Sequence, residues 1–274
     1  MITSLSSGFL NYNQLQQDGN VEEATGLYNQ ALEAALKSQD SENVYFIKQE
    51  LGMIAFSLQK YKDAEMLFLE VESYLSDKKR KNDILNISRV MLKLAEIYEN
   101  FNNFEKAEQY YKECATNLKS KVNNSEEIKD EKIVELWLLF LSSEAHYYLH
   151  RENFEKAQKY FKQAYEFSLR TQGEVSEYTV TFLYQLGAVS FQKGELEIAV
   201  DYLEKASELG KHLPGMIELS NVFITLGNIY LKQGFTKKAE KLCTEGYKNA
   251  TRHKYKKGIE ESSACLKELK DAFS

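Results

Sequence analysis

Small and aromatic residues recur along the chain at fixed spacings. A small residue is followed three positions later by an aromatic or small one, nine later by alanine, four later by an aromatic residue or leucine in most copies, and three later by another small residue. Residues three or four positions apart share one helix face, so each copy predicts two antiparallel helices joined by a short turn. The full copies are Gly52, Ala55, Ala64, Phe68 and Val71; Ala95, Tyr98, Ala107, Tyr111 and Cys114; Ala145, Tyr148, Ala157, Phe161 and Ala164; Gly187, Ser190, Ala199, Leu203 and Ala206; and Gly227, Tyr230, Ala239, Cys243 and Gly246.

The alternation of small and large residues predicts a stack of helix pairs. Two antiparallel helices approach closely only where small side chains face each other, and the aromatic residues then fill the gap to the next pair. This arrangement is typical of tetratricopeptide repeats, whose standard period is about 34 residues. The sequence therefore predicts an all-α, right-handed helical solenoid of tetratricopeptide type, with longer repeats of about 40 residues.

We expect one domain over residues 1–274. Residues 1–40 read as a degenerate first repeat, 41–255 as five repeats, and 256–274 as a capping helix with a polar outer face. The degenerate repeat keeps only the second half of the pattern, Ala24, Tyr28 and Ala31. The longest step between repeats contains Asn123–Glu127, which predicts a loop or an exposed helical extension and the most mobile internal segment.

Composition agrees with helices and argues against several functions. The chain has one proline and 13 glycines, which suits helices joined by short turns. Its net charge of −6 disfavours nucleic-acid binding, and the basic runs Lys78–Lys81 and Arg252–Lys257 are interpreted as solvated loops. No run of about 18 apolar residues occurs, so no membrane span is expected in this chain.

No residue pattern indicates catalysis, a metal or a cofactor. Cys114, Cys243 and Cys265 are far apart and form no Cys-x-x-Cys pair, which predicts neither a disulfide framework nor a zinc site and favours a reducing compartment. Cys114 and Cys243 occupy core positions and are interpreted as buried, inert thiols. His146 and His150 lie four apart, but no glutamate follows His146 as in zinc proteases, so they are interpreted as surface or groove histidines.

The expected binding surface is the concave face, formed by the first helix of each pair. Its lining mixes apolar and polar residues, and it has no cluster of lysine and asparagine to clamp a terminal carboxylate. It therefore suits a helix or extended peptide with apolar anchors from a protein partner. Tyr184, Phe191, Asn228 and Leu231 are the residues expected to contact that partner. The predicted lining is Gln49, Met53, Phe56, Leu92, Glu96, Ser142, His146, Tyr184, Phe191, Ile224, Asn228 and Leu231, with Glu99, Leu149 and Ala188 at neighbouring positions.

Several stretches between Ala31 and Leu269 carry a family resemblance. They are Asn82–Ser88 leading into Leu92–Tyr98, Thr171–Glu174 before Thr179, Tyr202–Leu209, and Glu218–Val222. In order and character they resemble the mitochondrial tetratricopeptide repeat protein nineteen family. The resemblance implies a non-catalytic scaffold for assembly and maintenance of respiratory complex III. It also implies complex III subunits or assembly intermediates as partners, at the mitochondrial inner membrane or in the matrix.

Other interpretations stay open at this point. The family commonly has His-Pro after its Gln-Gly-Glu, where this chain has Ser176 and Glu177. The first basic residue is Lys37, so any organelle address is expected to be removed from this chain or unconventional. A cytoplasmic adaptor of the kinesin light chain or signalling type is the alternative, although the heptad coiled coil of those proteins is not seen. An enzyme is the third, with His146 and His150 as its candidate feature.

Overall fold

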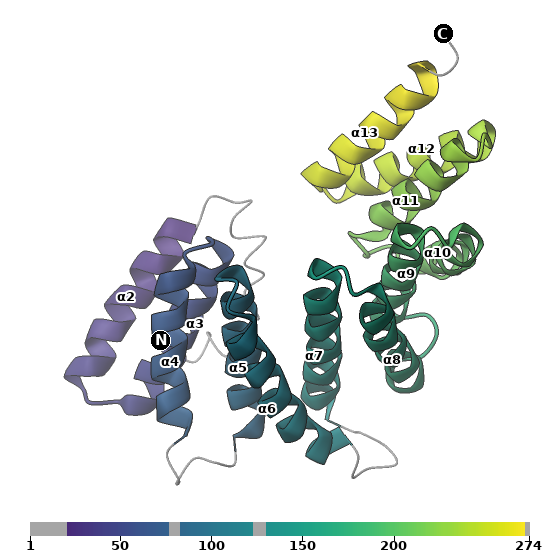
Figure 1. Ribbon diagram of the computed structural model, residues 1–274. Helices are drawn as coiled ribbons and strands as arrows, with labels where there is room; N and C mark the ends of the chain where they lie inside the picture. The colour runs from purple at the N-terminus through teal and green to yellow at the C-terminus, as the bar shows by residue number, and fades with distance from the viewer. Residues whose placement is uncertain (1–20, 77–82, 123–129, 272–274) are drawn as a thin grey trace. The chain divides into compact units, whose positions relative to one another are not determined.

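The protein is built of helices joined by short turns (Figure 1). The structure, a computed structural model, describes residues 21–76, 83–122 and 130–271, which contain twelve helices and no strand. The predicted all-α class is therefore confirmed. The helices are α2 (Val21–Lys37), α3 (Ser41–Ser57), α4 (Tyr61–Leu75), α5 (Ile84–Asn100), α6 (Phe104–Val122), α7 (Glu131–His150), α8 (Phe154–Gln172), α9 (Glu177–Gln192), α10 (Leu196–Gly210), α11 (Leu219–Lys232), α12 (Thr236–Arg252) and α13 (Lys256–Asp271).

The chain divides into two compact units, residues 1–140 and 141–274, with the boundary inside α7. From α2 to α6 in the first unit, and from α8 to α13 in the second, helices that are consecutive along the chain pack against one another. One hydrophobic cluster of the first unit lies between α2 and α3, with Leu67 of α4 against it. The cluster of the second unit extends from α9 to α13. The boundaries of the repeats and of the capping helix stay predictions.

Small residues mark the places where paired helices approach most closely. The alanines at 64, 107, 157, 199 and 239 are wholly buried. A Cβ atom added to Gly187 would lie 2.6 Å from the Cγ atom of Leu203, and one added to Gly227 would lie 2.7 Å from the sulfur of Cys243. Larger side chains at these positions would therefore force the helices of a pair apart.

The first and second helices of each pair are joined by one recurring turn. In the turn after α9, the N–H of Gly194 donates to the carbonyl of Phe191 at 3.0 Å, and the N–H of Glu195 donates to that of Ser190 at 2.9 Å. These two bonds satisfy helix-end carbonyls and place the residue after the cap in the left-handed region. That residue is Gln59 (φ 58°), Asn102 (φ 57°), Glu152 (φ 56°), Gly194 (φ 81°) or Gly234 (φ 82°).

The first and last described helices differ from those between them. In α2, Ala24 and Ala31 are partly exposed, although the alanines equivalent to Ala24 in the five full repeats are wholly buried. The buried residues of α13 form a single stripe along the helix: Gly258, Ser262, Cys265 and Leu269. Most of the remaining α13 residues are exposed and many are charged.

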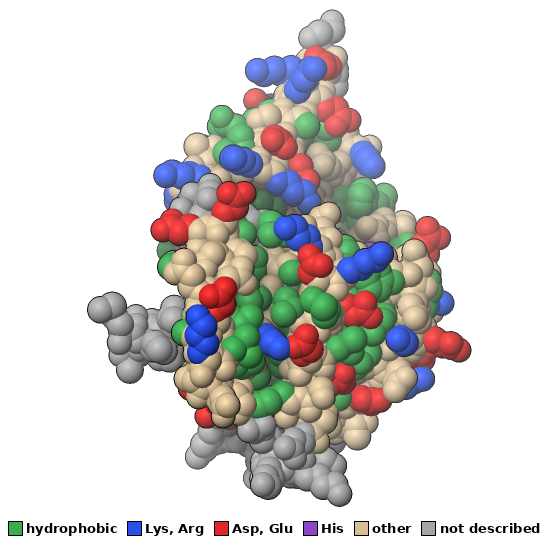
Figure 2. All heavy atoms as spheres, turned by 90° about the vertical axis from the view of Figure 1, so that its left-hand side faces the viewer, with side chains coloured by type: hydrophobic (Ala, Val, Ile, Leu, Met, Phe, Trp, Pro, Cys, Tyr) green, Lys and Arg blue, Asp and Glu red, His purple; other side chains and the backbone are tan. Residues whose placement is uncertain are grey.

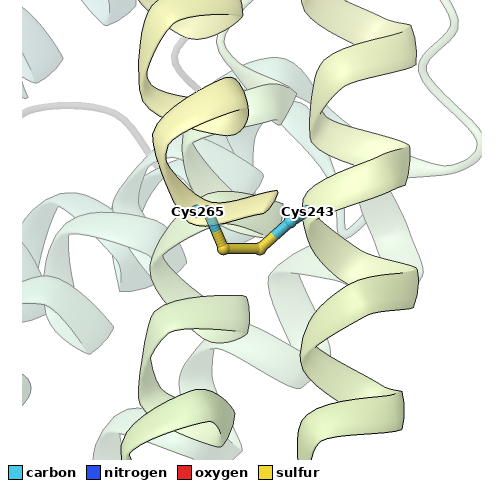
Figure 3. Close-up of a disulfide and its surroundings, with 2 residues drawn as sticks. All are labelled: Cys243 and Cys265. Atoms are coloured by element: carbon cyan, nitrogen blue, oxygen red, sulfur yellow. A yellow bond between two sulfur atoms is a disulfide. The ribbon is translucent and has the colours of Figure 1, made fainter. Parts of the chain in front are cut away.

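The expectation that the cysteines form no disulfide is wrong, and so is the interpretation of Cys243 as an inert thiol. Cys243 of α12 and Cys265 of α13 are joined by a disulfide (Figure 3). They lie 22 residues apart in sequence, but α12 and α13 pack side by side and bring their Cα atoms to 6.1 Å, within the disulfide range. Spacing along the chain carried no sign of this pairing. Cys114 is free and buried, as expected.

Some expectations fall outside the described residues. These are the first half of the degenerate repeat within 1–20, the basic run Lys78–Lys81, the whole segment Asn123–Glu127, and the final residues 272–274. The second basic run crosses the turn between α12 and α13, but its interpretation as a loop holds only for residues 253–255, because Arg252 ends α12 and Lys256 begins α13. In the described part of the chain, no helix combines the length and apolar character needed to cross a bilayer.

The recurring turn predicts that replacing a glycine with alanine changes stability in opposite directions at Gly194, which lies in the turn, and at Gly26, which lies within a helix. Gly194→Ala should lower the stability of the second unit by about 1 kcal/mol, because alanine resists a positive φ. Glu152→Gly should raise it by a similar amount. The matched control is Gly26→Ala, which lies within α2 with no atom within 4 Å of the added Cβ and should stabilise. Urea denaturation midpoints provide the measurement, and destabilisation by Glu152→Gly would contradict the role assigned to this turn.

Candidate functional site

The residues of the predicted lining lie on the first helices of the pairs, in both units. Gln49, Leu92 and Ile224 are buried, so they pack in the interior and offer no surface to a partner. The other members of the lining are half-buried, with part of each side chain open to solvent. These are Met53, Phe56, Glu96, Ser142, His146, Tyr184, Phe191, Asn228 and Leu231. Their role in binding stays a prediction.

In the first unit, a lysine that the sequence analysis missed connects two predicted positions. The ammonium of Lys93 on α5 lies over the ring of Phe56 on α3, 4.7 Å from its centroid. The same nitrogen is 2.6 Å from a carboxylate oxygen of Glu96. A cation over an aromatic face and an ion pair thus hold three side chains of two neighbouring helices together. This part of the lining is amphipathic and ordered before any partner binds.

Glu99 lies one turn beyond Glu96 on α5, and its pKa is the most perturbed among the carboxyls of residues 21–76, 83–122 and 130–140. Its pKa is raised to about 7, chiefly by burial, with a further upward contribution from the charge of Glu96. The hydroxyl of Tyr111 donates a hydrogen bond to Glu99, which acts in the opposite direction by stabilising the carboxylate. This carboxyl therefore changes charge near neutral pH.

In the second unit, Tyr184 of α9 is a partly buried aromatic residue of the lining. It packs against the core formed by α9 to α13. Burial raises the pKa of Tyr184, and a hydrogen bond with Thr225 of α11 lowers it. The charges of Glu261 and Lys257 on α13 also act on this phenol. Three helices therefore contribute to the surroundings of Tyr184.

Further along the same helices, Phe191 is covered by a lysine. The ammonium of Lys232 on α11 lies 5.0 Å from the centroid of the Phe191 ring on α9. Leu231 packs against the core beside this pair, and Asn228 is half-buried one turn earlier on α11. The second unit thus combines apolar anchors with one amide and one cation on neighbouring first helices, as a peptide-binding surface requires.

The contacts around His146 and His150 on α7 indicate a structural role for this pair. The Nδ1 atom of His146 lies 2.8 Å from the carbonyl oxygen of Ser142, within hydrogen-bonding distance. Its ring meets the ring of Phe161 edge-on at 5.2 Å, and the His146 and His150 rings are 6.5 Å apart. Across the described ranges, no group of three or more histidine, cysteine or acidic side chains could hold a metal ion.

A second recurring contact stabilises the helix pairs and was also missed from the sequence. The ammonium groups of Lys106, Lys156 and Lys238 lie 4.7, 4.6 and 4.6 Å from the ring centroids of Tyr98, Tyr148 and Tyr230, each tyrosine eight residues earlier. The spacing of eight residues was visible in the sequence, but nothing indicated that it joins the two helices of a pair across their turn. These contacts brace the turns and are interpreted as structural.

Two cavities lie in the first unit, away from the predicted lining. One of about 280 Å³ is lined by Met91 and by polar residues of α6. One of about 650 Å³ is bordered by Asp40, Asp83 and the stacked rings of Tyr45 and Tyr74. Both aspartates already accept hydrogen bonds as N-caps of α3 and α5. These two carboxylates are therefore engaged in capping the helices.

Helices α2 and α4 of the first unit carry exposed apolar residues. Figure 2 faces the side on which α2 lies in Figure 1, and it shows apolar side chains interspersed with lysine, arginine and acidic ones. Leu27 of α2 and Met66 of α4 are 61% and 58% exposed, and Leu36 and Leu69 of the same helices are also exposed. This mixed surface is a second place where a protein could pack.

Comparison with known proteins places the repeats among tetratricopeptide repeats. Residues 140–212 and 88–116 match two models of the tetratricopeptide repeat. In solved structures, BtubC (BKLC) from P. vanneervenii aligns with a TM-score of 0.67 and 20% identity, covering 86% of this chain and 92% of that one. The fold is therefore an all-α tetratricopeptide-repeat fold, as predicted.

Curated relatives confirm the resemblance predicted from the sequence. The Drosophila melanogaster protein named tetratricopeptide repeat protein 19 homolog, mitochondrial, is 22% identical over 89% of this chain. The Mus musculus protein named tetratricopeptide repeat protein 19, mitochondrial, is 26% identical over 84% of this chain. The matches cover 66% and 64% of those proteins, so the chain spans just under two thirds of their length.

Glu99 predicts a pH-dependent contribution to stability. The folded protein retains the Glu99 proton between about pH 4.5 and 7, whereas the unfolded chain releases it, so this contribution falls as pH rises through that window. Glutamine keeps no titrating proton, so the stability of Glu99→Gln relative to the unsubstituted protein should rise as the pH goes from 5 to 8. The expected rise is about 1 kcal/mol after allowance for solvent screening.

Urea denaturation at both pH values measures this difference. The matched control is Glu105→Gln, at an exposed position of α6, where no such rise is expected. A stability difference for Glu99→Gln that stays constant from pH 5 to pH 8 would show that the carboxyl titrates alike in folded and unfolded chains.

Proposed function

We propose that this chain, which has the tetratricopeptide-repeat fold and relatives named as mitochondrial proteins, is a non-catalytic scaffold that binds a protein partner in mitochondria. The proposed partner is respiratory complex III, through its subunits or assembly intermediates. The observation that carries the proposal is the similarity to tetratricopeptide repeat protein 19 over 84–89% of this chain. It extends across the repeats of both units and is not confined to one motif.

The surface proposed to bind the partner is the half-buried lining of the second unit. Tyr184, Phe191 and Leu231 provide apolar anchors that already rest on the core, so little side-chain freedom is lost on binding. Asn228 can both donate and accept a hydrogen bond to the main chain of an extended segment. Lys232, over the ring of Phe191, adds a cation that favours an acidic or carbonyl-rich segment.

The proposed location is the mitochondrial inner membrane or the matrix. Support comes from the names of the relatives, both of which are described as mitochondrial. The proposal of a scaffold without catalysis is supported by the engagement of the perturbed groups in structural contacts: the Glu99 carboxyl accepts from Tyr111, and the Tyr184 phenol bonds to Thr225.

The test is affinity purification of the tagged protein from its own cells, followed by mass spectrometry against a mock-tag control. Enrichment of complex III subunits is the expected result. Recovery of motor or signalling proteins without respiratory subunits would overturn the assignment and favour a cytoplasmic adaptor.

Alanine at Tyr184, Phe191, Asn228 and Leu231 together should lower partner recovery at least tenfold, because a few enclosed anchors carry most binding energy. Since three of these side chains pack on the core, a second variant avoids the interior by combining Asn228→Ala with Lys232→Glu, and it should lower recovery severalfold. Thermal melting by circular dichroism verifies that each variant is folded.

The matched control replaces four exposed residues on the second helices of the same unit with alanine: Lys159, Asp201, Glu240 and Lys241. It should retain full recovery. Equal recovery by the control and both lining variants would place the binding surface elsewhere on the molecule.

A further inference from the structure

The last described helix packs against its unit through few large apolar side chains. Of the buried positions on α13, Gly258 and Ser262 contribute almost no apolar area, and Leu269 is the single large apolar side chain among them. Leu266 packs against the core and is only partly buried. An ordinary amphipathic helix buries several large side chains along such a stripe. Apolar burial alone therefore holds α13 weakly.

Polar groups in the same contact add little to this attachment. The hydroxyl of Ser262 is buried and has no hydrogen-bond partner, which costs free energy each time α13 docks. Gly246 and Gly258 allow α12 and α13 to approach closely, since a Cβ on Gly246 would lie 3.2 Å from the Ser262 oxygen and one on Gly258 would lie 2.9 Å from the Cβ of Ala250. The close approach is what brings the two sulfurs within bonding distance.

The disulfide is the strongest connection across this contact. Cys243 and Cys265 are 0% and 2% exposed, and their bond joins the middle of α12 to the second half of α13 (Figure 3). A cross-link that closes a loop of this length lowers the entropy of the undocked state, which disfavours opening on the order of a hundredfold. Most of the bias toward the docked helix thus resides in one reducible bond.

We infer that Cys243–Cys265 is a thiol–disulfide site whose oxidation state controls whether α13 stays docked on α11 and α12. The reacting partner is a dithiol reductant. Because both sulfurs are buried, a brief opening of α13 precedes reaction. One thiolate of the reductant attacks Cys265 and releases the Cys243 thiolate, which takes up a proton. The second thiol of the reductant then attacks the mixed disulfide and frees Cys265, so that two electrons and two protons have moved to the protein.

The docked helix also packs against α11, which carries Asn228 and Leu231 of the proposed partner surface, and this step rests on the proposed function. Lys257 and Glu261 on the exposed side of α13 act electrostatically on Tyr184. When α13 undocks, these charges leave the neighbourhood of Tyr184 and the flank of α11 becomes open to water. Reduction should therefore weaken partner binding without changing any residue that touches the partner.

The first test counts free thiols. Alkylation under denaturing conditions, followed by mass measurement, should label one cysteine, Cys114, before reduction and all three after it. Labelling of three cysteines without reductant, in protein purified under thiol-blocking conditions, would overturn the inference.

The second test is hydrogen exchange of α13, measured by mass spectrometry with and without a dithiol reductant. In the unsubstituted protein, reduction should speed exchange on the order of a hundredfold. Cys265→Ala should exchange fast under both conditions, and Cys114→Ala, the matched control, should respond like the unsubstituted protein. Unchanged exchange on reduction would show that packing alone holds α13 and would overturn the inference.

These two tests need no partner, so they distinguish failure of the redox site from failure of the proposed function. Where the partner is recovered, Cys265→Ala should lower its recovery severalfold relative to Cys114→Ala. Equal recovery by these two variants, with α13 undocked in the first, would overturn the coupling between the disulfide and the partner surface.

Discussion

The close approach of paired helices is the constraint on which the rest of the structure depends. It requires alanine or glycine where the two backbones come nearest, and the wholly buried alanines at 64, 107, 157, 199 and 239 meet this requirement. Close helices in turn need a sharp connection, which the recurring left-handed turn supplies. The lysine placed over a tyrosine in three of the pairs then joins the two helices across this connection. The small buried residues, the left-handed turn and the lysine–tyrosine contact thus all follow from the close approach of the paired helices.

The same constraint determines which side chains are left for binding. With the small residues turned inward, the first helices present half-buried aromatic and polar residues such as Phe56, Tyr184 and Phe191. Cations from the neighbouring first helix lie over two of these rings, Lys93 over Phe56 and Lys232 over Phe191. Each such surface is amphipathic and largely ordered in advance, which reduces the entropy lost when a peptide binds. Recognition of another protein is the chemistry these surfaces support best.

At the last described helix, the packing constraint leads to a different outcome. Gly246, Gly258 and Ser262 permit a close approach of α12 and α13, but they leave too little apolar area to hold the helix firmly. The disulfide between Cys243 and Cys265 compensates for this shortage. A covalent bond can be broken by a change in redox conditions, whereas apolar burial cannot. The position of α13, and the charges it places near Tyr184, therefore depend on the redox conditions around the protein.

The periodic part of the protein was predictable from local rules, since residues that share a helix face recur at spacings of three and four along the chain. The all-α class, the alanine contacts and the approximate helix positions therefore followed from the order of residues, as did the family resemblance. Contacts between separate helices required the tertiary structure, because they join residues whose distance along the chain carries no signal. The burial of Leu92 and Ile224, the cations over Phe56 and Phe191, and the Cys243–Cys265 bond are all of this kind. Each depends on the rotation and spacing of neighbouring helices, which packing of the whole unit decides.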